Sequence, residues 1–306
     1  MNKLVLSLFL CMSTAMSAQI FTSVSLRKIA GETASDTRIA GISPAGDYVL
    51  TTTLGNKGLK KLDMSTGREE VLTTAAGAGV GAVVSDDGSE VVFREVHFTT
   101  DEHVRMTALK SVKVDSKAVS EVMSPSRQLK AYGFSGNTAF TMDENDDIMT
   151  QKGVSRSLID KTAPSVFLED LQLMLNKDGE TVLLSPNGTE ETYIWPSISP
   201  DKKHILYYVG GEGAYVCDME GKNVKFIAHD CRAPQWYDNN TIIGMDDKDD
   251  GERLLTSCIM AYTLDGKSQR LTDPVSLTMY PYCSKTKGVV ACSTGYGEIY
   301  LINLTK

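Results

Sequence analysis

The sequence lacks the features of several large classes of protein. Beyond the N-terminus no stretch approaches the length of about 18 apolar residues that a spanning helix needs, so we expect no transmembrane segment in the mature chain. The 31 Lys and Arg residues are outnumbered by 39 Asp and Glu, and no basic stripe can neutralise phosphates, which disfavours a nucleic-acid partner. The G-x-S-x-G motif of serine hydrolases is missing. Helical periodicity is almost absent, and short β-rich runs take its place.

Cysteine is sparse, and its spacing suggests no pairs. One of the six cysteines, Cys11, lies in the N-terminal segment. The others are Cys217, Cys231, Cys258, Cys283 and Cys292. An odd number leaves at least one thiol free or paired between chains. No C-x-x-C pair of the zinc-binding kind occurs, so we expect most of these side chains to be small buried hydrophobes in strands.

The first 18 residues have the pattern of a secretory signal peptide. Lys3 precedes an apolar run from Leu4 to Met12, and small residues follow up to Ala18. A leucine precedes Cys11, where a lipobox requires Gly, Ala or Ser, so lipid attachment is disfavoured. We predict cleavage after Ala18 and a periplasmic or secreted mature chain, residues 19–306, that forms a single domain.

One β-hairpin pattern recurs six times along the chain. Each copy has an apolar residue, Ser, Pro or Asp, a turn cluster and a second apolar strand, although the copy from Lys130 has lost the Ser-Pro-Asp letters. Pro or Asp favours the turn and Gly or Asn accepts a positive φ, so the flanking strands pair. The copies begin at Gly41, Val83, Lys130, Ser197, Gln235 and Tyr282.

A second hairpin, with an Asp-Gly type of turn, alternates with the first. Its copies begin at Leu62, Val112, Leu175, Cys217 and Tyr262. Two hairpins make one four-stranded sheet. The C-terminal GEIYLINLTK supplies a third strand without a fourth, and the N-terminal strand from Val24 matches the missing one. We therefore predict an all-β, six-bladed β-propeller of four-stranded antiparallel blades, closed by the N-terminal strand completing the last blade.

The segment WPSISPDKKHILYYVGGEGAYVCDMEGKNVKFI from Trp195 resembles the repeat of the TolB-like propellers, an exported bacterial family with WD-like repeats. The likeness covers nearly all of the mature chain and is weakest at about residues 143–170. That stretch is too long for a normal connection between strands, and we predict that it is an insertion on the ligand face, with a degenerate blade that has no binding role as the alternative. The resemblance implies the fold and leaves the function open, because such repeats serve scaffolds, sensors and accessory domains of enzymes.

Propeller geometry places the candidate ligand-binding side chains on one face. Loops between blades, and between second and third strands, surround one mouth of the central channel. Aromatic and Arg side chains there can anchor a ligand at low entropic cost. For Tyr193 and Trp195, packing beneath a strand is the alternative. The candidates are His97, Phe98, His103, Tyr193, Trp195, His229, Arg232, Tyr280 and Tyr296.

Two acidic loops and three histidines are candidate ligands of a cation. The loops place oxygens at alternate positions, as a calcium cage begins, but we favour solvated loop charge as the explanation of both. The residues are Asp143, Asn145 and Asp147 in one loop, Asp247, Asp249 and Glu252 in the other, and His97, His103 and His229. We predict no cofactor, with calcium as the alternative.

The leading interpretation is a binding and interaction module, because no paired nucleophile and base can be identified from spacing. Its ligand would be a peptide, protein partner or glycan of the cell envelope, held on the inter-blade loop face. The alternative is a propeller-type lyase or cyclase with a cation at the channel mouth. A structural subunit of an envelope complex is a third interpretation, which the resemblance to TolB implies.

Overall fold

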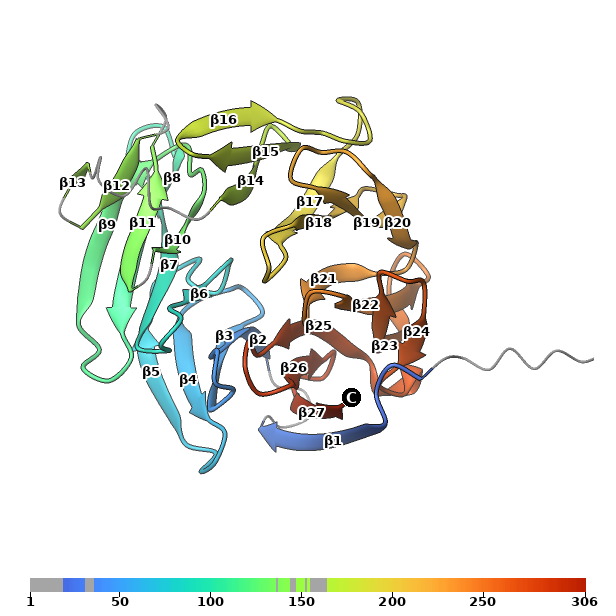
Figure 1. Ribbon diagram of the computed structural model, residues 1–306. Helices are drawn as coiled ribbons and strands as arrows, with labels where there is room; N and C mark the ends of the chain where they lie inside the picture. The colour runs from blue at the N-terminus through green and yellow to red at the C-terminus, as the bar shows by residue number, and fades with distance from the viewer. Residues whose placement is uncertain (1–18, 31–35, 136, 144–146, 152, 155–163) are drawn as a thin grey trace, which may run out of the picture.

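Seven small sheets arranged in a ring make up the protein (Figure 1). The structure, a computed structural model, describes residues 19–30, 36–135, 137–143, 147–151, 153–154 and 164–306, so the predicted signal peptide lies outside the described residues. All strand pairs are antiparallel, and six of the sheets have four strands. The fold is a seven-bladed β-propeller, and the prediction of six blades was wrong.

Within each blade the strands follow one another outward from the central channel, and the blades are numbered here in chain order. The innermost strands are β2 (Thr37–Ile42), β6 (Val83–Val84), β10 (Tyr132–Ser135), β14 (Ser165–Glu169), β17 (Tyr193–Ile198), β21 (Arg232–Trp236) and β25 (Thr278–Cys283). The second strands are β3 (Tyr48–Thr53), β7 (Glu90–Phe98), β11 (Thr138–Met142), β15 (Gln172–Lys177), β18 (His204–Val209), β22 (Thr241–Asp249) and β26 (Val289–Thr294).

The outer strands complete the sheets. The third strands are β4 (Leu59–Asp63), β8 (Arg105–Lys113), β12 (Ile148–Thr150), β16 (Glu180–Leu183), β19 (Gly213–Asp218), β23 (Leu254–Thr263) and β27 (Ile299–Thr305). The fourth strands are β5 (Glu69–Thr73), β9 (Val119–Ser126), β13 (Gly153–Val154), β20 (Lys225–Ala228), β24 (Ser268–Arg270) and β1 (Ser23–Ala30). A short 3-10 helix, η1 (Pro274–Ser276), precedes β25. No helix in the described residues is long and apolar enough to cross a membrane.

The N-terminal strand closes the ring, as the sequence predicts. Strand β1 pairs with β27, so that Val24 lies opposite Leu304 in the last blade. The residues before β1 extend this contact to blade 6, because the backbone N–H groups of Ile20 and Phe21 both donate to the side-chain oxygen of Gln269 in β24, at 2.8 and 2.7 Å. The N-terminal segment therefore joins two blades as well as completing one.

Blade 4 is the blade that the sequence pattern missed. The stretch predicted as an insertion contributes β12 and β13 to blade 3 and β14 to blade 4, and the hairpin from Leu175 provides the second and third strands of blade 4. The turn between β14 and β15 is made by Asp170 and Leu171, with φ of 48° and 64°. Left-handed backbone at leucine is rare, and the turn carries none of the Gly, Asn or Pro letters that mark hairpins. Asp170 is the only turn-favouring residue here, so this turn gives only a weak sequence signal.

The serine of the repeated hairpin has a structural role. In blade 5, Ser199 Oγ accepts a hydrogen bond from the backbone N–H of His204 at 3.0 Å and donates to Asp201 Oδ1 at 2.7 Å. In blade 2, Ser85 Oγ accepts from the N–H of Glu90 at 3.0 Å in the same way. One hydroxyl thus satisfies backbone and side-chain groups of a tight turn. The recurrence of Ser in the motif follows from this geometry.

The hydrophobic core is divided among the seven interfaces between neighbouring blades. Each cluster joins side chains of two adjacent sheets, as Val49 and Leu62 of blade 1 pack with Ala291 of blade 7. The five cysteines among the described residues are free. Burial raises the pKa of the Cys217 and Cys292 thiols to about 12, so they remain protonated at neutral pH. They behave as small core residues, which agrees with the sequence prediction.

Candidate functional site

A polar groove opens on the inter-blade loop face, where blades 6, 7 and 1 meet. Its cavity has a volume of about 510 Å³. The lining includes three arginines, three acidic residues and one tyrosine. They are Arg38, Arg232, Arg253, Asp247, Asp249, Glu252 and Tyr280. We call this cavity the Arg232–Tyr280 groove. It brings together two of the predicted ligand-binding residues, Arg232 and Tyr280, and one of the two predicted acidic loops.

An ion pair with one free oxygen forms the wall of the groove on blade 6. Arg232 Nη1 donates to Asp247 Oδ2 at 2.8 Å, and the Asp247 side chain is only 6% exposed. Asp247 Oδ1 is buried and has no hydrogen-bond partner among the described residues. Burial raises the pKa of Asp247 above its ordinary value, while the Arg232 guanidinium opposes this rise.

A bulge in the inner strand presents Tyr280 to the same groove. The register of β25 against β26 shifts between Met279 and Tyr282, and Tyr280 has a φ of 52°. Its ring lies 6.0 Å from the guanidinium carbon of Arg38, within cation–π range. Bulges of this kind redirect side chains next to binding sites.

The bulge recurs in blades 5 and 6, each time at a left-handed residue followed by proline. Trp195 and Ala233 have φ of 53° and 47° and precede Pro196 and Pro234. Proline is tolerated there because the innermost strand is the edge of its sheet. This Pro stands three residues before the hairpin Ser in blade 5, at Ser199, and could have marked the bulge in the sequence.

Comparisons with known proteins identify the fold and no family. No family profile and no curated protein matches the sequence. The WD40 repeats of RRP9 share 9% identity, with a TM-score of 0.62 over 91% of this chain and 97% of that one. An oligogalacturonate lyase in complex with manganese shares 16% identity at a TM-score of 0.48, over 87% of this chain and 76% of that one. TolB from Acinetobacter baumannii shares 12% sequence identity at a TM-score of 0.43, over 86% of this chain and 53% of TolB.

These similarities support a β-propeller of the WD-like kind. At such low identity they concern the fold alone, and the two scores below 0.5 carry no argument about activity. The chain spans about half of the length of TolB. The fold does not determine the function, which depends on the side chains of the site.

The remaining predicted aromatic residues divide between core and surface. Tyr193 is fully buried, and its hydroxyl donates to the carbonyl oxygen of Gly188 at 3.0 Å, so it belongs to the core between blades 4 and 5. Trp195 is half-buried and packs edge-on against Tyr208, with ring centroids 5.5 Å apart. Tyr296 is 50% exposed in the loop from β26 to β27, next to Gly295 of the groove.

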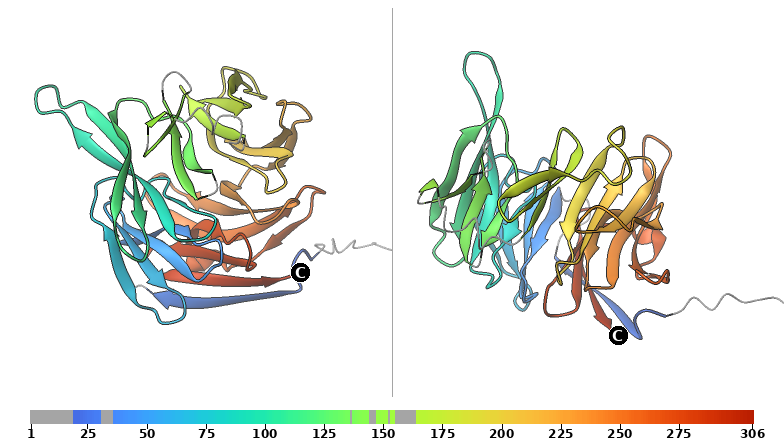
Figure 2. Two further views of the ribbon diagram at one scale, coloured as in Figure 1. Left: turned by 60° about the vertical axis from the view of Figure 1, so that its left-hand side comes forward. Right: turned by 45° about the horizontal axis from the view of Figure 1, so that its top comes forward.

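The predicted histidines lie apart from the groove lining. His97, Phe98 and His103 belong to the long β7–β8 hairpin, whose turn extends beyond the other loops (Figure 2). His97 Nε2 lies 3.1 Å from a carboxylate oxygen of Glu95. His229, in the connection from blade 5 to blade 6, has its Nδ1 at 2.7 Å from the carbonyl oxygen of Glu212.

The described residues do not fit the cation site of the alternative interpretation. No group of three or more His, Cys, Asp or Glu side chains within them gathers as metal ligands require. Asp247 contributes an ion pair to the groove instead. Asn145, from the other acidic loop, lies outside the described residues.

Removing Arg232 is expected to make stability depend on pH through Asp247. Arg232→Ala leaves a buried carboxylate without its partner, so the pKa of Asp247 rises further and the variant loses about 1–2 kcal/mol at pH 7, less than a fully buried pair because Arg232 is partly exposed. A carboxyl with a raised folded-state pKa destabilises the protein while ionised, and the penalty disappears once it is protonated. The difference in melting temperature from wild type should shrink as pH falls from 7 toward 4.

Two comparisons control this experiment. Arg68→Ala removes an arginine whose side chain is 76% exposed, and its difference from wild type should be small at every pH. Arg232→Ala combined with Asp247→Asn should recover much of the loss at pH 7. If the difference in melting temperature between wild type and Arg232→Ala stays constant with pH, Asp247 is not the group that makes the stability of the variant depend on pH.

Proposed function

We propose that the protein is an exported binding module that holds an extended peptide segment of a cell-envelope partner in the Arg232–Tyr280 groove. The observation that carries this proposal is a groove in which three arginines, two of them without a salt bridge among the described residues, lie together with Tyr280. A peptide supplies N–H donors for the carboxylates of the groove and carbonyl or carboxylate oxygens for the guanidinium groups.

The guanidinium groups of the groove are not all committed to internal ion pairs. Among the described residues neither Arg38 nor Arg253 forms a salt bridge, whereas Arg232 pairs with Asp247. Tyr280 adds a rigid aromatic surface beside Arg38. Tyr and Arg are the residue types that most often dominate binding energy at protein interfaces. The mixture of both charge signs favours a peptide over a glycan, which offers mainly neutral hydroxyls.

A panned peptide tests the groove directly. Peptides selected from a phage-displayed random library on the immobilised protein should bind wild type, and Tyr280→Ala should weaken them about tenfold or more because it removes the aromatic anchor and frees Arg38. Calorimetric titration of one synthetic peptide measures the effect. Phe226→Ala, at a 52% exposed aromatic on the outer strand of blade 5, is the matched control and should change nothing.

Two outcomes would reject the proposal. Equal affinity of the selected peptides for wild type and Tyr280→Ala would place their site elsewhere. Binding on a glycan array that Tyr280→Ala abolishes, without peptide binding, would assign the groove to glycans. The lyase interpretation predicts instead a stoichiometric metal ion in the purified protein that only chelators remove, which elemental analysis can detect.

A further inference from the structure

The central channel contains an arginine, Arg94, that has no carboxylate partner among the residues that the structure describes. The channel forms a cavity of about 800 Å³, lined by all seven innermost strands. Its charged lining residues are Arg94, Lys130 and Lys285, and it has no Asp or Glu among the described residues that line it. This contrasts with the chain as a whole, whose formal net charge is −8.

The three cations differ in how their charge is balanced. Lys285 forms an ion pair with Asp86 at 2.5 Å, and Lys130 lies 3.9 Å from Glu169. Arg94 forms no salt bridge within the part of the chain that the structure describes. The only hydrogen bond of its side chain there is donated by Nε to the Tyr132 hydroxyl at 3.0 Å. A guanidinium has five N–H donors, so the two terminal amino groups remain available.

The fold orients Arg94 toward the channel. The innermost strand of its blade, β6, has only two residues and begins at Val83, two residues after Gly81, so the longer β7 is less covered there. A side chain at Gly81 would collide with the Tyr132 hydroxyl, and its Cβ would lie 3.8 Å from Arg94 Nη2. Glycine therefore leaves the space that both side chains occupy.

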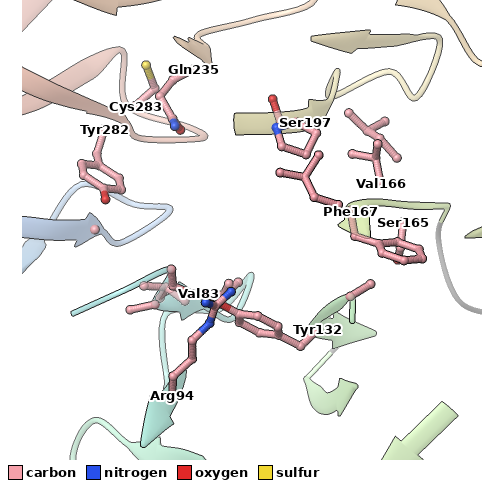
Figure 3. Close-up of a pocket in the computed structure, with 18 of the residues that line it drawn as sticks. Val83, Arg94, Tyr132, Ser165, Val166, Phe167, Ser197, Gln235, Tyr282 and Cys283 are labelled. Atoms are coloured by element: carbon pink, nitrogen blue, oxygen red, sulfur yellow. Dashed lines mark hydrogen bonds between the residues drawn. The ribbon is translucent and has the colours of Figure 1, made fainter. Parts of the chain in front are cut away.

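Tyr132 holds the guanidinium in place. Its hydroxyl donates to the carbonyl oxygen of Gly81 at 2.7 Å while it accepts from Arg94 Nε, and the guanidinium carbon lies 5.2 Å from the centre of the tyrosine ring. Figure 3 shows the guanidinium beside Tyr132 at the edge of the cavity. Because its Nε is already hydrogen-bonded, the Arg94 guanidinium is preorganised to bind a planar anion such as a carboxylate through its two terminal amino groups.

The opposite wall offers neutral polar groups. Ser197 and Gln235 lie across the cavity from Arg94 (Figure 3). The Ser197 hydroxyl oxygen is buried and has no hydrogen-bond partner among the described residues. The amide group of Gln235 can both donate and accept hydrogen bonds. A ligand that spans the cavity would meet a cation at one end and an amide group at the other.

We propose that the channel is a second binding site, distinct from the peptide groove, for a small hydroxycarboxylate. Its carboxylate accepts two hydrogen bonds from the terminal amino groups of Arg94, and one of its hydroxyl groups bonds to the side-chain amide of Gln235. The cavity volume is within the range typical of small-molecule sites.

Citrate is a suitable probe for calorimetric titration, with its neutral triethyl ester for comparison. Wild type should bind citrate and not the ester. Arg94→Gln should weaken citrate binding at least tenfold, and Arg94→Lys, which keeps the charge but loses the fork, should weaken it less. Tyr132→Phe should weaken it about threefold, because Arg94 loses its anchor. Arg68→Gln makes the same change of charge at an exposed site and should have no effect.

Several results would overturn the proposal. Equal citrate affinity of wild type and a folded Arg94→Gln variant would do so, with thermal unfolding confirming the fold. A short peptide that binds through Arg94 with a free C-terminus but not when amidated, while citrate does not bind, would assign the channel to a protein terminus. Tyr280→Ala should leave citrate binding intact. The proposal for the channel and the proposal for the peptide groove can therefore be rejected independently of each other.

Discussion

Replacing Phe21 by alanine is expected to lower the free energy of unfolding by about 3–5 kcal/mol, the usual range for a buried phenylalanine. Phe21 is fully buried in the cluster between blades 6 and 7, and its ring meets Tyr237 edge-on with centroids 5.1 Å apart. Its backbone is also held by Gln269. The loss would therefore occur where the N-terminal segment completes the ring.

Chemical denaturation monitored by fluorescence and circular dichroism measures this effect. Phe98→Ala is the matched control, because Phe98 is 64% exposed on the projecting β7–β8 hairpin and its loss should cost little. Similar losses for the two variants would mean that the N-terminal segment does not stabilise the ring.

Gly213→Ala is expected to destabilise the protein by about 3–5 kcal/mol, because backbone strain and a steric clash occur together. Gly213 has a φ of 135°, which side chains strongly disfavour. A Cβ there would lie 2.8 Å from the Cα of His229 and would also collide with the carbonyl oxygen of Ala228. Both obstacles are backbone atoms of the adjoining strand end and cannot move aside as a flexible side chain could.

A substitution at Gly211, in the same turn, distinguishes the cost of backbone strain from the cost of the steric clash. Gly211 has a φ of 79°, and a Cβ added to it would meet nothing within 4 Å. Gly211→Ala should therefore cost only about 1 kcal/mol, from backbone strain alone. Denaturant midpoints of the two variants provide the comparison, and equal midpoints would show that the turn adapts to the added methyl group.

The sequence predicted the blade architecture wherever turn chemistry was explicit. Hairpins marked by Ser, Pro, Asp or Gly were correctly located, and so was the pairing of the two chain ends. The predicted number of blades was one too few. The turn formed by Asp170 and Leu171 depends on the packing around it rather than on the conformational preference of its residues. A weak turn signal made two blades resemble one blade with an insertion.

The candidate sites were less predictable than the fold. Arg232 and Tyr280 could be selected because residue type and loop position together suggested exposure on one face. The buried position of Tyr193 could not be foreseen, since it depends on contact with the neighbouring blade. Arg94 was missed because it lies within a strand, and its access to the channel results from a short neighbouring strand and a glycine from another segment.

The pairing of Thr22 with Thr305, 283 positions apart in the chain, has a consequence during synthesis. The last blade cannot form until β27 has left the ribosome, so every nascent chain passes through a stage in which the ring is open. In that stage the flank of blade 1 that includes Val49 and Leu62 has no neighbour to cover it. A chaperone that covers this exposed apolar surface until the last blade has formed would limit aggregation of the incomplete protein.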